Sequence, residues 1–236
     1  MKSKLVSRAT VELLGTGLLV AAVVGSGIMG ERLSGGNVAL ALLANTIATG
    51  AILVALILTF RPISGAHFNP AVTLAFAMRR LFLWREVPAY VAVQFIGAIF
   101  GTLMAHLMFS REIYSLSHHP RSGFAQLLSE LVAAFGLLCV IWGCTRARHD
   151  MAVPIGVASY IVAAYWFTAS TSFANPAVTV ARSLTDTFAG IRPVDVPGFV
   201  AAQIIGALAA TAFFSRIDRI DRIEKIPQLL EPGEKP

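Results

Sequence analysis

Two asparagines are the residues of this chain best placed to handle a polar solute, because each opens the same five-residue motif. The motif is Asn-Pro-Ala-Val-Thr, and it occurs at residues 69–73 and at 175–179, each time after an apolar stretch. A carboxamide donates and accepts hydrogen bonds without carrying charge. Proline suits the first position of a helix and asparagine the position before it. The motifs therefore predict short helices over 70–79 and 176–184.

Helices of this length reach only about halfway across the apolar core of a bilayer. If they enter from opposite faces, their N-terminal ends meet at mid-membrane and create a positive potential there. Irregular backbone at that depth is tolerated only where it is buried in protein or lines a cavity. A symmetric pair of such segments favours a pore over two re-entrant capping loops with no pore. The residues that we assign to the path are Asn69, Pro70, Ala71, Asn175, Pro176 and Ala177.

The composition indicates the membrane setting that these short helices need. Of the 236 residues, 56% are hydrophobic and only 14% are charged, and the mean hydropathy is +0.71. A soluble domain carries about 25% charged residues. Stretches long enough to cross a bilayer lie at about 9–30, 37–60, 87–109, 123–145, 151–170 and 196–215. The first is too long and too rich in glycine for a cleavable signal, so we expect a retained span.

The chain also repeats itself, which predicts its architecture. The two asparagine motifs match at an offset of 106 residues, and Gln94-Phe-Ile-Gly-Ala matches Gln203-Ile-Ile-Gly-Ala at an offset of 109. Each half contains three spans, and because three is odd the second half must be inserted upside down. We therefore predict an all-α membrane protein with six transmembrane helices, two re-entrant half-helices and an inverted 3+3 repeat. It forms a single channel domain over 1–215, with repeats at about 8–110 and 123–215, followed by a charged cytoplasmic tail at 216–236.

The net charge of +6 reflects membrane orientation and not a nucleic-acid partner. With both termini in the cytoplasm, 14 of the 19 Lys and Arg residues fall on the cytoplasmic side, as the positive-inside rule requires. Cys139 and Cys144 are expected to serve as small apolar side chains, without a disulfide or a metal site. No nucleophile–base pair, metal-ligand cluster or phosphate loop stands out, so we predict neither an enzyme nor a cofactor.

Two carboxylates lie inside predicted spans at equivalent positions of the repeats. Glu12 and Glu130 are candidates for a proton relay, which would make the protein an ion-coupled transporter. The alternative, which their symmetric placement favours, is that each accepts hydrogen bonds from the backbone of a re-entrant loop. Gln94 and Gln203 are expected to brace the loops in the same way. His67, two residues before Asn69, is expected to brace its loop or line the pore, and a titrating gate stays open.

These motifs, with Ser64-Gly-Ala-His-Phe68, the two glutamates and the two glutamines, resemble the aquaporin or major intrinsic protein family over residues 8–215. The resemblance implies a homotetramer in the plasma membrane with one pore per subunit. It also implies a narrow filter, whose four positions are carried over by spacing from Asn69 and Asn175: Thr49, Ala163, Ser172 and Val178. Most members carry arginine at the position of Val178. With valine there, this filter lacks the five N–H donors of a guanidinium group. We therefore expect a wide, mildly polar filter.

The stretch 174–191 is similar to a bacterial branch found with arsenic-resistance genes, in which valine likewise replaces the filter arginine. This resemblance implies a channel in the bacterial inner membrane that passes neutral arsenous acid. A water or glycerol facilitator is the alternative, and an ion-coupled secondary transporter is a further one. Arg182 lies one helical turn beyond Val178 and either replaces part of the missing charge or is a surface residue, which we favour.

Overall fold

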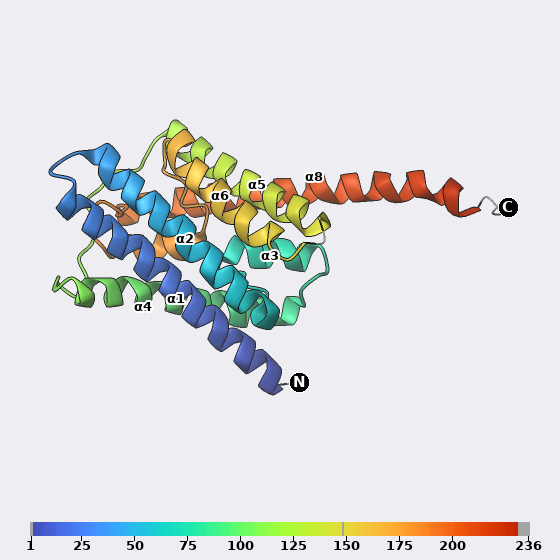
Figure 1. The fold of residues 1–236 in the computed structure, drawn as a ribbon, viewed down its shortest axis with the longest axis horizontal. Helices are drawn as coiled ribbons and strands as arrows, with labels where there is room; N and C mark the ends of the chain where they lie inside the picture. The colour runs from blue at the N-terminus through green and yellow to red at the C-terminus, as the bar shows by residue number, and fades with distance from the viewer. Residues whose placement is uncertain (1, 148, 231–236) are drawn as a thin grey trace.

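The computed structural model describes the backbone of residues 2–147 and 149–230 and the side chains of residues 4–147 and 149–220. The described residues form helices joined by turns and by longer irregular segments, among them 109–123 and 183–192 (Figure 1). The long helices are α1 (Lys2–Leu33), α2 (Val38–Ser64), α4 (Val87–Met108), α5 (Phe124–Arg146), α6 (Ala152–Phe167) and α8 (Val196–Leu230). Shorter elements complete the chain: α3 (Pro70–Met78), α7 (Pro176–Arg182) and the 3-10 turns Trp84–Glu86 and Pro193–Asp195.

The helices confirm the expected all-helical membrane fold. Among the described residues, five helices are long and apolar enough to cross a bilayer, and α6, with 16 residues, is an apolar helix below that length. The channel domain was predicted to end at residue 215, but α8 continues without a break through the first part of the predicted tail to Leu230. Residues 231–236 of that tail lie outside the described residues.

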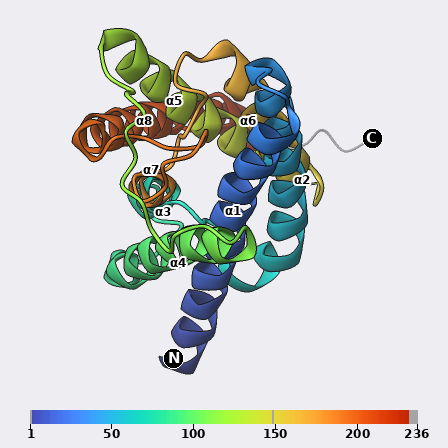
Figure 2. The same ribbon diagram turned by 90° about the vertical axis from the view of Figure 1, so that its left-hand side faces the viewer.

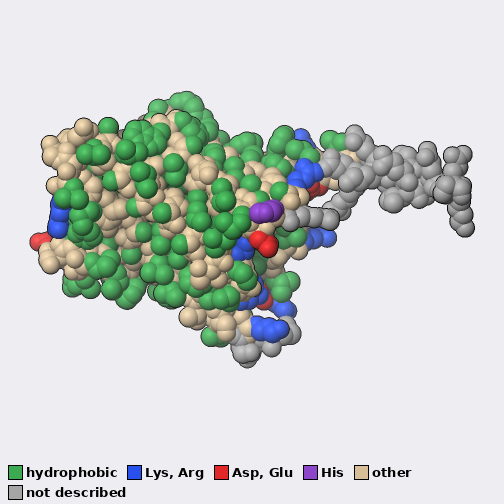
Figure 3. Space-filling view, viewed as in Figure 1, with side chains coloured by type: hydrophobic (Ala, Val, Ile, Leu, Met, Phe, Trp, Pro, Cys, Tyr) green, Lys and Arg blue, Asp and Glu red, His purple; other side chains and the backbone are tan. Residues whose placement is uncertain are grey.

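In Figure 1, α1 begins below the right-hand part of the helix bundle, and α8 extends beyond the bundle toward the same side. We call this side the terminal end. The opposite side, where the connections 34–37, 109–123 and 183–195 gather, we call the loop end. Figure 3 shows that hydrophobic side chains, together with backbone and other side chains outside the charged classes, cover the middle of one face. The Lys and Arg side chains on this face gather toward the terminal end. That distribution is the one expected of a protein whose middle section is embedded in lipid.

The two halves pack in equivalent ways around the short helices. Helix α1 packs on α4 and α5 packs on α8, while α1 contacts α2 and α5 contacts α6. Each short helix contacts the third span of its own half and that of the other half, so that α3 and α7 lie between α4 and α8 (Figure 2). Hydrogen bonds place the end of α7 at the loop end, while Arg79 after α3 pairs with Asp218 in the extension of α8. The short helices therefore enter from opposite ends.

Glycines allow the closest helix contacts of the bundle. A Cβ atom added at Gly101 of α4 would lie 2.2 Å from the carbonyl oxygen of Gly17 in α1. A Cβ atom added at Gly206 of α8 would lie 2.2 Å from the carbonyl oxygen of Leu131 in α5. Both obstacles are backbone atoms of a packed helix, so the two helices would have to separate. Small residues at such crossings are typical of membrane helices.

We expect Gly101→Ala to destabilise the protein by about 1–3 kcal/mol, because overpacking forces α1 and α4 apart. Thermal unfolding in detergent would measure the change as a lower midpoint. Gly143→Ala in α5 is the matched control, since nothing lies within 4 Å of the added Cβ atom. In that open helical position alanine is expected to be neutral or stabilising. Equal midpoints for the two variants would contradict the close-packing argument.

Candidate functional site

The two re-entrant loops meet through their asparagines, as the motifs predict. The side-chain amide of Asn69 donates to the carbonyl of Ala174 at 2.8 Å, and that of Asn175 donates to the carbonyl of Phe68 at 2.8 Å. Each side-chain oxygen also caps its own short helix, Asn69 through the amide of Ala71 and Asn175 through that of Ala177. An amide group has two N–H donors. One donor on each asparagine is therefore left for a solute.

The loops leading to the asparagines share an unusual backbone. Residues three and one before each asparagine have a left-handed conformation: Ala66 and Phe68 in the first loop (φ 51° and 48°), and Ser172 and Ala174 in the second (φ 48° and 50°). Non-glycine residues adopt this region rarely, and it persists only where the surroundings enforce it. In both loops a buried glutamate supplies that constraint.

Glu12 of α1 holds the first loop. One carboxylate oxygen accepts from the backbone amide of His67 at 2.9 Å and from the Ser64 hydroxyl at 2.7 Å. The other accepts from the amide of Phe68 at 2.7 Å and from the side chain of Gln94 at 2.9 Å. Glu12 is completely buried. Two of these four donors are backbone amides of the loop, which have no helical partner, so Glu12 braces the loop.

Glu130 of α5 holds the second loop in the equivalent way. Its carboxylate accepts from the backbone amides of Phe173 at 2.9 Å and Ala174 at 2.8 Å, and from the side chain of Gln203 at 2.6 Å. Gln203 also donates to the hydroxyl of Thr179, as Gln94 does to that of Thr73. His67 joins the first network through Thr73, 3.2 Å from its Nδ1, and packs against the ring of Phe76. The predicted bracing residues thus lie together in two matching clusters.

A cavity of about 280 Å³ runs past both asparagines and is lined by residues of both halves. At one end its wall includes Arg61 and Thr145, near the terminal end of α2 and α5, and at the other it includes Arg182. Apolar side chains form most of the rest, among them Leu53, Val157 and Ile141. No aspartate or glutamate lines the cavity among the described residues. A path of this kind suits neutral solutes that carry both apolar and hydroxyl groups.

The structure places three of the four expected filter residues on the cavity wall. Thr49, Ser172 and Val178 all line it and are buried. The hydroxyl of Ser172 has no hydrogen-bond partner among the described residues. A buried hydroxyl on a cavity wall is available to a solute, since such groups otherwise remain unsatisfied at a cost.

The assignment of Ala163 to this wall is wrong. Ala163 is exposed on the outside of α6 and does not line the cavity. The cavity face of α6 carries Val153, Val157, Ile161 and Tyr165, which recur every four residues. Ala163 is two positions from Ile161 and from Tyr165, or about 200° around the helix, so it points away. Counting back from Asn175 gave the wrong residue because the count crosses the non-helical segment after Phe167. Such a count does not fix which face of α6 a residue occupies.

Tyr165 is the α6 residue at the filter position to which the sequence spacing assigned Ala163. It is buried, lines the cavity, and its hydroxyl lies 3.2 Å from the hydroxyl of Thr49. The four-residue recurrence along α6 could have identified it, because apolar residues at this spacing share one face of a helix. The cavity wall therefore carries, at the expected filter positions, three hydroxyl-bearing residues, Thr49, Tyr165 and Ser172, together with Val178.

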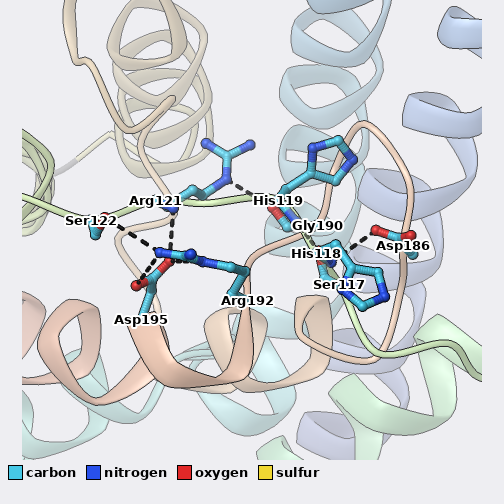
Figure 4. Close-up of polar contacts among 9 residues, drawn as sticks. All are labelled: Ser117, His118, His119, Arg121, Ser122, Asp186, Gly190, Arg192 and Asp195. Carbon is cyan, nitrogen blue, oxygen red and sulfur yellow. Dashed lines mark hydrogen bonds and ion pairs between the residues drawn. The ribbon is translucent and has the colours of Figure 1, made fainter.

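At the loop end, the segment between α4 and α5 is hydrogen-bonded to the segment that follows α7 (Figure 4). The amide of His118 donates to Asp186, and Arg121 donates through its amide to Asp195 and through Nε to the carbonyl of Gly190. Arg192 forms an ion pair with Asp195 at 3.0 Å. Desolvation raises the pKa of the Asp195 carboxyl, but the hydrogen bonds from Arg192 and Arg121 and the charge of Arg192 outweigh it and hold the pKa below its usual value.

Comparison with known proteins agrees with this geometry. Residues 1–169 match the sequence profile of the family described as Major intrinsic protein. Aquaglyceroporin AqpS of Rhizobium meliloti (strain 1021) is 59% identical over 88% of this chain and 88% of its own length. Aquaporin NIP2-1 of rice (Oryza sativa subsp. japonica) is 33% identical over 76% of this chain and 61% of its own length.

A solved structure shows the same fold. The X-ray structure of the aquaglyceroporin from Plasmodium falciparum superposes with a TM-score of 0.69, covering 89% of this chain and 95% of that chain at 18% sequence identity.

Proposed function

The chain belongs to the major intrinsic protein family and is a membrane channel for small neutral solutes, and on that premise we propose that it passes arsenous acid by passive diffusion. The observation that carries the proposal is Val178 on the cavity wall, at the position where most members of the family have arginine. Valine is smaller than arginine and carries no charge, so it leaves more of the path open to a solute larger than water.

The chemistry of the wall supports the choice of solute. Arsenous acid is neutral at pH 7 and carries hydroxyl groups that donate and accept hydrogen bonds. Thr49, Tyr165 and Ser172 offer hydroxyls around the constriction, and Asn69 and Asn175 each retain a free N–H donor farther in. Exchange of hydration for these groups, one after another, permits passage without tight binding.

Passive conduction also fits the role of the buried carboxylates. Glu12 and Glu130 are engaged with loop donors on both carboxylate oxygens, which leaves neither as a free proton carrier along the path. The rival reading, an ion-coupled transporter, needs such a group. Glycerol and water are the alternative solutes, because the same hydroxyl-lined constriction accepts them.

The setting follows from the same premise. We place the protein in the bacterial inner membrane as a homotetramer, with both termini in the cytoplasm and the loop end outside. The gathering of basic side chains near the start of α1 and the extension of α8 supports this orientation. Exposed apolar side chains on the long helices, such as Leu14, Ile96 and Ile205, would meet lipid or neighbouring subunits.

Stopped-flow uptake by vesicles that contain the purified protein tests the proposal. We expect arsenous acid and glycerol to enter at least about tenfold faster than into protein-free vesicles of the same lipid, as a wide uncharged path allows. The internal concentration should level off at the external one, with or without a pH gradient. Water flux without arsenous acid flux would leave a water channel, and accumulation above the external concentration would refute passive conduction.

A further inference from the structure

Arg182, the last residue of α7, is not the surface residue that the sequence favoured. It is 2% exposed, and it lines the cavity on the same side as Val178, one helical turn nearer the loop end. Arginine is almost never fully buried unless it is paired. Arg182 forms no salt bridge with a described carboxylate, and no described Asp or Glu lines the cavity. The position therefore holds a buried positive charge beside the solute path.

The Arg182 side chain is fixed by its neighbours. Its Nε donates to the carbonyl of Ala189 in the segment after α7, and its guanidinium lies 3.4 Å from the centre of the Phe173 ring. The ring in turn packs edge-on against Phe199 of α8 at 5.3 Å. Cation–π contacts are strongest where water is excluded. The only hydrogen bond that the Arg182 side chain makes to a described residue is from Nε, and Arg182 lines the cavity, so the donors of its terminal nitrogens remain for a solute or for water there.

A second arginine supports the same ring. The guanidinium of Arg121 lies 4.8 Å from the centre of the Phe173 ring. It donates to the carbonyls of Gly190 and Ser170, which ties the α4–α5 connection to the second re-entrant loop. The two like charges near one ring repel each other, so their cation–π contacts and their hydrogen bonds to backbone carbonyls must offset that repulsion. Phe173 also lines the cavity, so Arg121 stabilises the platform on which Arg182 rests.

We propose that Arg182 is a specificity-determining residue: its guanidinium, held on Phe173 with the help of Arg121, keeps cations out of the pore. The inference rests on the proposed function, since it concerns the same path. A fixed positive charge on the wall of a mostly apolar passage raises the energy of an entering cation and leaves a neutral solute almost unaffected. The path thereby has a small uncharged side chain at Val178, and the charge that excludes cations lies one helical turn nearer the loop end, at Arg182. The free donors of Arg182 would also bind hydroxyl oxygens of an entering solute.

Urea and guanidinium ion provide the test, because they are nearly the same size and shape and differ in charge. Uptake of each by vesicles is measured, with potassium and valinomycin holding the membrane voltage at zero. We expect Arg182→Met to raise the guanidinium-to-urea permeability ratio by about tenfold or more. Arg182→Lys should keep the wild-type ratio. Arg111→Met removes a charge from an exposed residue of the loop end and should also leave the ratio unchanged.

The ratio decides the outcome in each case. An unchanged ratio in an assembled Arg182→Met protein would overturn the proposal. If Arg182→Met fails to assemble, the permeability ratio of Arg182→Gln is measured in its place. If both fail, Phe173→Leu keeps the charge but removes its platform, and a raised ratio supports the proposal while the wild-type ratio overturns it. Failure of the proposed function looks different, because the wild type would then not pass arsenous acid, whatever its guanidinium-to-urea ratio.

Discussion

Val178→Arg is expected to abolish arsenous acid and glycerol permeation while water permeation persists. Val178 lies on the cavity wall, which Ser172 and Thr49 also line, and no described aspartate or glutamate is part of that wall. Arginine there would extend a charged group with five N–H donors across the path. A solute larger than water would then have to displace it. We expect the permeability to arsenous acid to fall by at least about tenfold, as added steric and electrostatic barriers do at a pore constriction.

Stopped-flow uptake with wild-type and variant vesicles measures this effect, with assembly checked by size-exclusion chromatography. Val178→Leu is the matched control, because it adds volume without charge or donors and should keep most of the flux. Arg182 lies four residues farther along the same short helix, so the new arginine also meets a like charge, which is destabilising. Undiminished arsenous acid flux in an assembled Val178→Arg protein would show that this position does not limit the solute.

Glu130→Gln is expected to prevent assembly of a stable protein. Both carboxylate oxygens of Glu130 accept hydrogen bonds, from the amides of Phe173 and Ala174 and from Gln203. Glutamine offers only one acceptor oxygen and turns an amide group toward a donor. At least one buried donor then loses its partner, which costs about 1–3 kcal/mol and more beside a charged group. Because the second loop also holds left-handed Ser172 and Ala174, losing the brace releases a strained backbone.

The same substitution separates a brace from a proton carrier. The yield of monodisperse protein and the midpoint of thermal unfolding are compared for Glu130→Gln, Glu12→Gln and a control, Glu112→Gln. Glu112 is exposed in the connection between α4 and α5 and should behave as wild type. We expect both buried variants to melt far below the control or to fail to assemble. A stable, monodisperse Glu130→Gln protein that no longer transports would instead indicate proton coupling.

Much of this architecture is readable from the sequence because local chemistry determines it. Apolar stretches of membrane-spanning length predict the long helices, and the asparagine and proline of each motif set the start of α3 and α7 at the observed residues. The Glu-Leu pair that recurs at 12–13 and at 130–131 marks Glu12 and Glu130 as equivalent positions of the repeats. A buried carboxylate needs donors, and the nearest unsatisfied donors of such a fold are those of a loop that has no helix to satisfy them.

What the sequence by itself could not determine depends on side-chain direction and on contacts between distant segments. Ala163 was assigned by counting through an irregular segment, and only the packed position of α6 shows that Tyr165 faces the cavity instead. Arg182 resembles a surface residue in the sequence. Its burial comes from Phe173 on one side and from Ala189, which the chain brings back after α7, on the other. Local propensity and hydrophobicity set the helices, whereas the wall of the pore is set by which faces the tertiary packing turns inward.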